Sequence, residues 1–270
     1  MNALSVVTSF SERGWHEYGR RFCATFFEYW PKNVALHIAS EDMDAVAVRD
    51  SAEHALEFHF HPLDNPFIQR FARDKRAQGR EQHASDVGWT PKKLADGYNF
   101  RYDAYRFAKK VFAIEAAAAQ CYAGGRLFWV DADVVTFEPV PLDLLERLLP
   151  DDVALSCLDR QPYHSECGFV GYNLSHPAAR GFIRDFAQLY EGGEVFGLRE
   201  WHDSWVFDWL RLNMQVPTYA IPHCSKKQPF INSELGRYMD HMKGSNKALG
   251  RTPQHLMVAG HGHRYWRDSA

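Results

Sequence analysis

Residues 126–130, Arg-Leu-Phe-Trp-Val, constrain the fold of this chain more than any other segment. Four consecutive apolar residues leave no polar face, so a strand made from them must be buried on both sides. Sheets with helices on both faces are typical of α/β proteins, in which strands and helices alternate along the chain. The sequence therefore predicts an α/β fold with this strand near the centre of a mixed, mostly parallel sheet.

The rest of the chain shows the expected alternation. Residues 4–8 and 34–38 are short apolar runs, and residues 15–29 between them carry aromatic side chains at helical spacing. This order is typical of parallel strands joined by a helix. Further strands are expected at 56–60, 153–158 and 169–172, and further helices at 102–124, 177–190 and 203–213.

No repeat or linker divides the 270 residues, a length that suits one large α/β domain. We expect a single domain over residues 1–270, with the polar residues 64–100 as an insertion. A composition of 46% hydrophobic and 24% charged residues excludes a disordered or fibrous protein. No apolar run approaches the ~20 residues that span a bilayer, and the five cysteines form no CxxC pair. A cytoplasmic protein without membrane association is the corresponding expectation.

The turn Asp131-Ala132-Asp133 follows the central strand directly. Open α/β sheets bind ligands at the carboxyl ends of their strands, so both carboxylates are expected to face such a crevice. Buried carboxylates need a positive partner, and a hard divalent cation such as Mn²⁺ or Mg²⁺ suits them. The alternative is an ordinary turn at the end of a strand with solvated side chains.

A second motif lies near the C-terminus, where His241, Gly244 and Lys247 recur at three-residue steps in a basic segment. A neutral imidazole can complete a metal site that carboxylates have begun. Glycine allows the backbone to approach a pyrophosphate, and lysine neutralises it. The alternative is a basic surface loop that happens to contain a histidine.

Together the two motifs resemble those of the retaining family 8 glycosyltransferases of the GT-A fold, which carry an Asp-x-Asp after a central strand and a late His-x-x-Gly-x-x-Lys. The Pro-Trp that often follows in that family is replaced here by Ala248-Leu249. Three shorter stretches match the family's motifs in order: 105–106 (Tyr-Arg), 165–168 (Ser-Glu-Cys-Gly) and 202–204 (His-Asp-Ser). The resemblance covers most of residues 4–247.

This resemblance implies a GT-A type fold with two halves. Residues 1–135 would form a Rossmann-like half that binds a nucleotide sugar. Residues 136–270 would form an acceptor half with a metal- and pyrophosphate-binding tail. The implied reaction transfers a sugar, glucose in our leading hypothesis, from a UDP-sugar to a hydroxyl group with retention of configuration.

The resemblance also assigns residues to the metal and the nucleotide. Asp131, Asp133 and His241 would hold Mn²⁺ or Mg²⁺, and the metal would bind the diphosphate. The nucleotide-sugar contacts that it implies are Thr8 and Ser9 for the nucleoside, Arg106, Gly244 and Lys247 for ribose or phosphates, and Asp131.

Two carboxylates are candidates for catalysis. Glu166 stands where the family often has Asn, and Asp203 is followed by Ser204 where the family often has Gln. A carboxylate near the anomeric carbon can stabilise an oxocarbenium-like state, act as a nucleophile or accept a proton. The sequence does not divide these roles between Glu166 and Asp203. Asp203 could also cap the helix that begins at Ser204.

The acceptor is predicted from charge. Residues 70–110 hold 11 Lys and Arg against 5 Asp and Glu, and residues 211–270 hold 9 against 3. Stretches such as SECGFVGYN resemble glycosyltransferases of tailed phages, some of which add sugar to hydroxymethylated pyrimidines in DNA. We therefore expect double-stranded DNA to bind the basic blocks 70–110 and 226–251, with Trp89 or Tyr98 stacking on a flipped base. A charged mobile lid is the alternative for the first block.

Other functions remain open from the sequence. The acceptor could be a saccharide, a lipid-linked group or a protein hydroxyl. A metal-dependent nuclease or phosphodiesterase would use similar residues, although it would need a denser cluster of ligands. A sugar- or DNA-binding module without activity would not need both motifs. His261 and His263 form a further candidate metal pair, which we expect to be tail structure.

Overall fold

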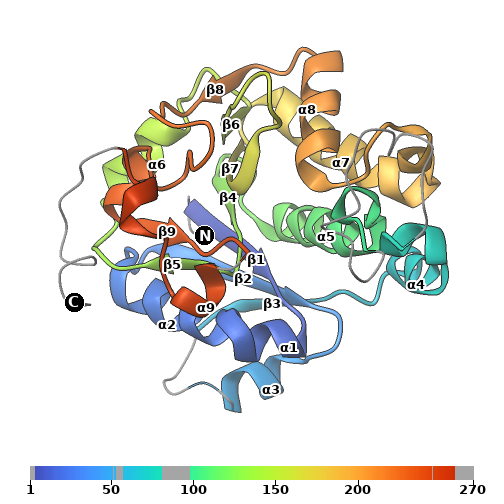
Figure 1. The fold of residues 1–270 in the computed structure, drawn as a ribbon, viewed down its shortest axis with the longest axis horizontal. Helices are drawn as coiled ribbons and strands as arrows, with labels where there is room; N and C mark the ends of the chain where they lie inside the picture. Colours follow the sequence, from blue (N-terminus) through green and yellow to red (C-terminus); the bar gives the residue numbers. More distant parts are fainter. Residues whose placement is uncertain (1–3, 51, 53–56, 81–97, 245, 259–270) are drawn as a thin grey trace.

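The computed structural model describes residues 4–50, 52, 57–80, 98–244 and 246–258. Within these ranges one sheet has seven strands in the order β3-β2-β1-β4-β7-β6-β8 (Figure 1). Its strands are β1 (Leu4–Ser9), β2 (Val34–Ser40), β3 (His59–Pro62), β4 (Arg126–Val130), β6 (Leu155–Leu158), β7 (Glu166–Asn173) and β8 (Thr218–Ala220). A separate antiparallel pair consists of β5 (Val134–Thr136) and β9 (Met239–His241).

The sheet is mixed and mostly parallel, as predicted. Strands β3, β2, β1 and β4 are parallel, β7 runs antiparallel to both β4 and β6, and β8 is parallel to β6. Strand β4 lies between β1 and β7, and Leu127, Phe128 and Val130 are fully buried in it. Its prediction as a buried central strand is therefore confirmed.

Helices cover both faces of the sheet. They are α1 (Glu12–Gly14), α2 (Arg20–Tyr29), α3 (Ala45–Asp50), α4 (Pro66–Arg73), α5 (Ala104–Gln120), α6 (Leu142–Leu148), α7 (Pro177–Gly192), α8 (Asp203–Asn213) and α9 (Asn246–Leu249). Leu127 and Trp129 of β4 pack with α5, α7 and α8, whereas Phe128 and Val130 pack with α2 and α6. The period-2 alternation of a strand thus divides β4 between two hydrophobic clusters.

Short helical turns connect these elements. They are the π-helical turn η1 (Trp15–Gly19) between α1 and α2, and the 3₁₀ turns η2 (Lys75–Gln78), η5 (Phe100–Tyr102), η6 (Glu194–Gly197), η7 (Glu234–Arg237) and η8 (Gln254–Leu256). None of the helices that the structure describes is long and apolar enough to cross a membrane.

Several expected boundaries were wrong. The strand expected at 56–60 begins only at His59, since its register pairs His37 with His59 and Ser40 with Pro62. Proline is tolerated there because β3 is an edge strand. Strand β7 begins at Glu166 rather than 169, and the β5–β9 pair was not predicted. The expected insertion 64–100 was predicted to be partly helical, and α4 and η2 confirm this; residues 81–97, with Trp89, lie outside the described residues.

Three histidines meet at the edge formed by β2 and β3. His37 Nδ1 lies 2.9 Å from His61 Nε2, and the His59 ring stacks on the His37 ring at 4.7 Å. Cys121 Sγ lies 3.7 Å from His37 Nε2. Burial, followed by the neighbouring His61 and His59, lowers the pKa of His37 to about 3. His37 is therefore neutral in the folded protein over a pH range in which a free histidine is charged.

We expect acid to destabilise the protein through His37. Between about pH 6.5 and about pH 3 the unfolded chain binds a proton at this residue and the folded chain does not, so the free energy of unfolding falls as pH falls. Urea unfolding measured across this range should show a shallower pH dependence in His37→Gln than in the wild type. The exposed His255 provides the control His255→Gln, which should keep the wild-type slope. Equal slopes in all three proteins would contradict the assignment.

Candidate active site

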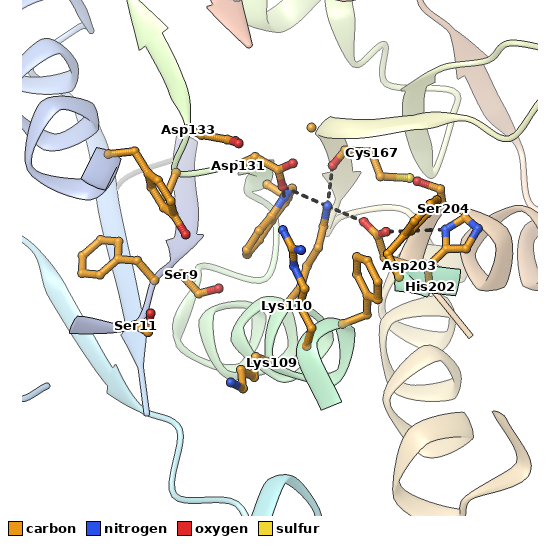
Figure 2. A pocket seen from close by; sticks show the side chains of 18 of the residues that line it. Ser9, Ser11, Lys109, Lys110, Asp131, Asp133, Cys167, His202, Asp203 and Ser204 are labelled. Carbon is orange, nitrogen blue, oxygen red and sulfur yellow. Dashed lines mark hydrogen bonds and ion pairs between the residues drawn. The ribbon is translucent and has the colours of Figure 1, made fainter. Parts of the chain in front are cut away.

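A cavity of about 470 Å³ opens where β1 and β4 end and α8 begins (Figure 2). The chain runs outward from β1 to β2 and β3 and then returns through α5 to β4 on the other side of β1, so the strand order reverses between β1 and β4. Such switch points form ligand crevices in open α/β sheets. The cavity therefore lies where the sequence predicted a ligand site.

Asp131 and Asp133 line one wall of the cavity, and the buried His241 lies behind them. His241 Nε2 lies 3.3 Å from Asp131 Oδ2 and 3.0 Å from Asp133 Oδ1. One ligand atom from each residue falls within 4.8 Å of the others. The pairing of β5 with β9 brings these residues together, because it places His241 opposite Val134, the residue after Asp133. The predicted metal ligands are thus neighbours in space.

A glycine makes room for this cluster. Strand β7 is antiparallel to β4, so its first residues lie beside the end of β4, and Asp131 N donates to Gly168 O at 3.0 Å. A Cβ atom on Gly168 would lie 2.4 Å from the His241 ring, well inside contact distance. His241 is itself almost fully buried, with 4% of its surface exposed. The imidazole can reach both aspartates only because residue 168 has no side chain.

Glu166 belongs to the same wall. It is buried at the start of β7, where Oε1 lies 3.3 Å from His241 Nδ1 and Oε2 pairs with Lys243. Lys247 Nζ lies 2.9 Å from Asp133 Oδ2. Both lysines line the cavity and both side chains are partly exposed. The wall therefore presents carboxylates and two ammonium groups to the cavity, with the imidazole of His241 buried behind them.

Lys110 occupies the middle of the cavity, as Figure 2 shows. Its Nζ lies 3.1 Å from Asp131 Oδ1 and 2.7 Å from Asp203 Oδ2, and donates to the backbone oxygen of Cys167 at 2.5 Å. Trp129 Nε1 also donates to Asp131 Oδ1, at 2.6 Å. Lys110 thus connects the wall that carries Asp131 with the first turn of α8, which carries Asp203.

The sequence interpretation missed Lys110 as a site residue and counted it only in a basic block. One signal was present: Lys110 follows Arg106 by four residues on a predicted helix, so both occupy the same face. Arg106 was assigned to the nucleotide, and both residues line the cavity. The expected helix is confirmed as α5.

Opposite charges control the ionisation of this site. Burial alone raises the pKa of Asp131, but the Lys110 ammonium and the hydrogen bond from His241 outweigh it and hold that pKa well below its usual range. Burial alone lowers the pKa of His241, and the nearby Asp133 and Asp131 more than reverse it. Burial also opposes ionisation of Glu166, but Lys243 and His241 lower its pKa. These carboxylates are ionised at neutral pH.

The other predicted nucleotide contacts divide into two groups. Ser9, Arg106 and Lys247 line the cavity. Thr8 is fully buried within β1, and neither it nor Gly244 is among the lining residues. Gly244 has a φ of +55°, which favours glycine at this turn between Lys243 and Lys247. These binding assignments remain predictions.

No protein-family model matches this chain, and no curated protein matches it. Solved structures do resemble it. Mouse xyloside xylosyltransferase 1 is 12% identical with a TM-score of 0.46 over 80% of this chain and 84% of that one. An active-site mutant of LgtC is 12% identical with a TM-score of 0.45 over 77% of this chain and 70% of LgtC.

A third structure, the glycosyltransferase GlyE of Streptococcus pneumoniae TIGR4 in its apo form, is 10% identical with a TM-score of 0.43. The match covers 81% of this chain but 45% of GlyE. At these identities the similarity concerns the general course of the chain. The interpretation of the site therefore rests on its own geometry.

Replacement of Gly168 by alanine tests the metal cluster. Because the added methyl group overlaps the His241 ring, Gly168→Ala should displace the imidazole and weaken Mn²⁺ binding by at least about tenfold, the loss of one ligand. Titration calorimetry measures the affinity. The matched control is Gly181→Ala, whose Cβ has no atom within 4 Å. Unchanged Mn²⁺ affinity in a folded Gly168→Ala protein would contradict the cluster as a metal site.

Proposed function

We propose that this chain is a metal-dependent glycosyltransferase that transfers a sugar, glucose in our leading hypothesis, from a UDP-sugar to a hydroxyl acceptor. The observation that carries the proposal is the arrangement of one cavity. Two aspartates and two lysines line one wall, with His241 behind them to complete a metal-ligand set, and a separate carboxylate, Asp203, lies beyond Lys110 at the amino end of α8. A metal site with lysines beside it suits a diphosphate, and a separate carboxylate suits the sugar that is transferred.

The donor atoms at the first wall suit Mn²⁺ or Mg²⁺. Asp131, Asp133 and His241 would hold the ion, and carboxylate oxygens are ligands that both cations accept. The space that Gly168 leaves for the imidazole fits such a set. When bound, the ion would neutralise negative charge on the diphosphate leaving group.

The chain's own cations would support the same leaving group. Lys243 and Lys247 line the cavity beside the metal ligands, and both are now paired with carboxylates, Glu166 and Asp133. A metal ion would take over the charge of Asp133 and leave Lys247 available for a phosphate. Arg106 lines the cavity on α5. Preorganised cations of this kind stabilise charge that develops as the bond to the leaving group breaks.

We assign the carboxylate nearest the transferred sugar to Asp203. It is the first residue of α8 and lines the cavity, and its Oδ2 is held by Lys110. The helix cap that the sequence offered as the alternative for Asp203 is supplied by His202, whose Nδ1 accepts from Trp205 N. Glu166 instead contacts His241 and Lys243, so we propose for it a role beside the metal ligands.

The acceptor proposal depends on which cations are accessible. In block 70–110, Arg70 donates to Glu191 O, Arg101 and Lys109 pair with Glu200 and Glu41, and Lys110 is buried. Arg73, Lys75, Arg76 and Arg80 are exposed, and Arg76 pairs with Asp74. Among the described residues of this block, Arg73, Lys75 and Arg80 are therefore the cations that support DNA as an acceptor, and a hydroxymethylated pyrimidine in DNA is our first candidate. Hydroxyl groups of saccharides, lipid-linked groups and proteins are the alternative acceptors.

Asp203→Asn tests the catalytic assignment. The variant keeps the shape of the side chain but loses the charge that would stabilise the transition state, so turnover should fall on the order of 10²-fold or more. UDP affinity with Mn²⁺ should stay within about twofold, because only the sugar end of the cavity is changed. Release of UDP from UDP-glucose measures turnover, and Asp143→Asn, at an exposed carboxylate, is the control. An equal loss of UDP affinity would place Asp203 in the nucleotide site.

The DNA proposal predicts binding that weakens steeply with salt, with a log–log slope of about −0.9 for each phosphate contact. Charge reversal of Arg73, Lys75 and Arg80 to Glu should abolish DNA binding and leave the hydrolysis of UDP-glucose unchanged. Reversal of the exposed Arg184, outside both blocks, is the control. Gel-shift titrations with hydroxymethyluracil, hydroxymethylcytosine and plain DNA measure the effect. If no DNA binds at micromolar protein, the acceptor is one of the other hydroxyl classes.

A further inference from the structure

A second group of potential metal ligands lies beside the other end of the cavity, which one of them, His202, lines. Glu200 and His202 flank Trp201 just before α8, and His164 lies in the loop before β7. Glu200 Oε2 is 2.9 Å from His202 Nε2 and 3.9 Å from His164 Nε2. One ligand atom from each of the three residues falls within 4.8 Å of the others. Among the described residues, this cluster and the one at Asp131 are the two groups that meet this distance.

The surrounding structure holds these side chains in place. Trp201, between two of them, donates its backbone N–H to Arg101 O at 2.7 Å, and its backbone oxygen accepts from Tyr190 Oη at 2.8 Å. Arg101 also lies 3.6 Å from Glu200 Oε1, the oxygen that does not face the histidines. Glu200 and His202 are 5% and 6% exposed, whereas the His164 side chain is 38% exposed. Glu200 and His202 are thus held in place on the buried side of the cluster, and the cluster is open to solvent at His164.

We propose that His164, Glu200 and His202 form a second metal site, for a divalent transition-metal ion of the Zn²⁺ class. Two imidazoles and one carboxylate are a common protein ligand set for Zn²⁺ with one coordination position left open. Two nitrogen ligands also favour a softer ion than the set of Asp131, Asp133 and His241, which has two carboxylates and one nitrogen. The two clusters therefore differ in the ions that they should select.

The second nitrogen of His202 supports this assignment. Nδ1 lies 3.4 Å from Trp205 N, at the long limit of a hydrogen bond, and 4.0 Å from Asp203 Oδ1. A metal ion on Nε2 requires the imidazole proton to be on Nδ1. Nδ1 would then no longer accept from Trp205 N, and its N–H could donate to the carboxylate of Asp203 instead. Carboxylates that receive the second ring N–H of a ligating histidine are the usual neighbours of protein metal sites.

The position of the cluster suggests what completes the ion's coordination. Figure 2 shows His202 and Asp203 on the far side of Lys110 from Asp133. His202 and the neighbouring Phe100, whose rings are 5.4 Å apart, both line the cavity. If the proposed glycosyltransferase function holds, a hydroxyl oxygen of the acceptor would suit the open position, because the sugar donor's diphosphate belongs at the opposite wall.

Metal titrations of the full chain test the site without any assay of activity. Because Zn²⁺ and Co²⁺ bind sites of this kind more tightly than Mn²⁺ and would displace it from the first cluster, the titrations use the chain with Asp133→Ala. In that chain Zn²⁺ calorimetry should show one site, and Co²⁺ should give a visible absorption band typical of nitrogen ligands. His164→Ala should weaken Zn²⁺ binding at least about tenfold and remove the band. His164 is chosen because it neither caps α8 nor lines the cavity. The exposed His255 provides the matched control His255→Ala, which should bind as the wild type does.

Two further variants separate the possible outcomes. Asp133→Ala should lose Mn²⁺ binding at the first cluster and keep the second metal. If the first cluster proves not to bind Mn²⁺, the proposed second site can still be correct, and if the second site fails, the first can still hold Mn²⁺. The double variant His261→Ala/His263→Ala, at positions outside the described residues, should keep it as well. Zn²⁺ binding that survives His164→Ala in the Asp133→Ala chain, or that disappears with the tail histidines, would overturn the proposal. Near-ultraviolet circular dichroism checks that each variant remains folded.

Discussion

Buried negative charge is the constraint around which this structure is organised. Asp131, Asp133, Glu166 and Asp203 line one cavity, and their side chains are at most 29% exposed. Carboxylates removed from water repel one another and cost several kcal/mol each unless cations compensate them. The cations here are Lys110, His241, Lys243 and Lys247, each within hydrogen-bond or ion-pair distance of at least one carboxylate. The site is therefore a balanced set of charges.

This balance explains why the two ends of the cavity suit different tasks. At the end of β4, the compensating groups are an imidazole and two partly exposed lysines, which a divalent cation and a diphosphate could engage. At α8, Asp203 is held by the buried Lys110, whose position is fixed by Asp131 and by the backbone oxygen of Cys167. A carboxylate held in this way can face a sugar without collapsing onto the metal ligands.

Basic residues serve more than one purpose in this chain. The excess of Lys and Arg in residues 70–110 suggested a phosphate-binding surface, yet Lys109 pairs with Glu41 and Lys110 with two aspartates. A count of charges along the sequence does not distinguish a solvent-facing arginine from a lysine that is buried in an ion-pair network. Among the described residues of this block, the exposed Arg73, Lys75 and Arg80 are the candidates for contact with a partner.

The sequence determined the elements whose signals are local. The apolar run of β4, the Asp-Ala-Asp that follows it and the helices α2, α5, α7 and α8 all follow from side-chain periodicity and from the residues that end each element. Asp131, Asp133 and His241 could be chosen in advance because their spacing resembles a known pattern. The α/β class and the mixed, mostly parallel sheet were correct because they too depend on the order of such local signals along the chain.

Only the tertiary structure decided how distant segments meet. The pairing of β5 with β9 places His241 beside Asp133, and the antiparallel placement of β7 beside β4 brings Glu166 and Gly168 to the same point. The fold placed Lys110 at the centre of the cavity, marked in the sequence only by its spacing from Arg106, and brought His164 to Glu200 and His202 without any motif. Contacts between residues tens of positions apart depend on strand order and register, which local periodicity does not encode. The sequence therefore determined which local segments carry the carboxylates and the histidine of the site. The strand order and register of the sheet decided that these segments meet at one cavity.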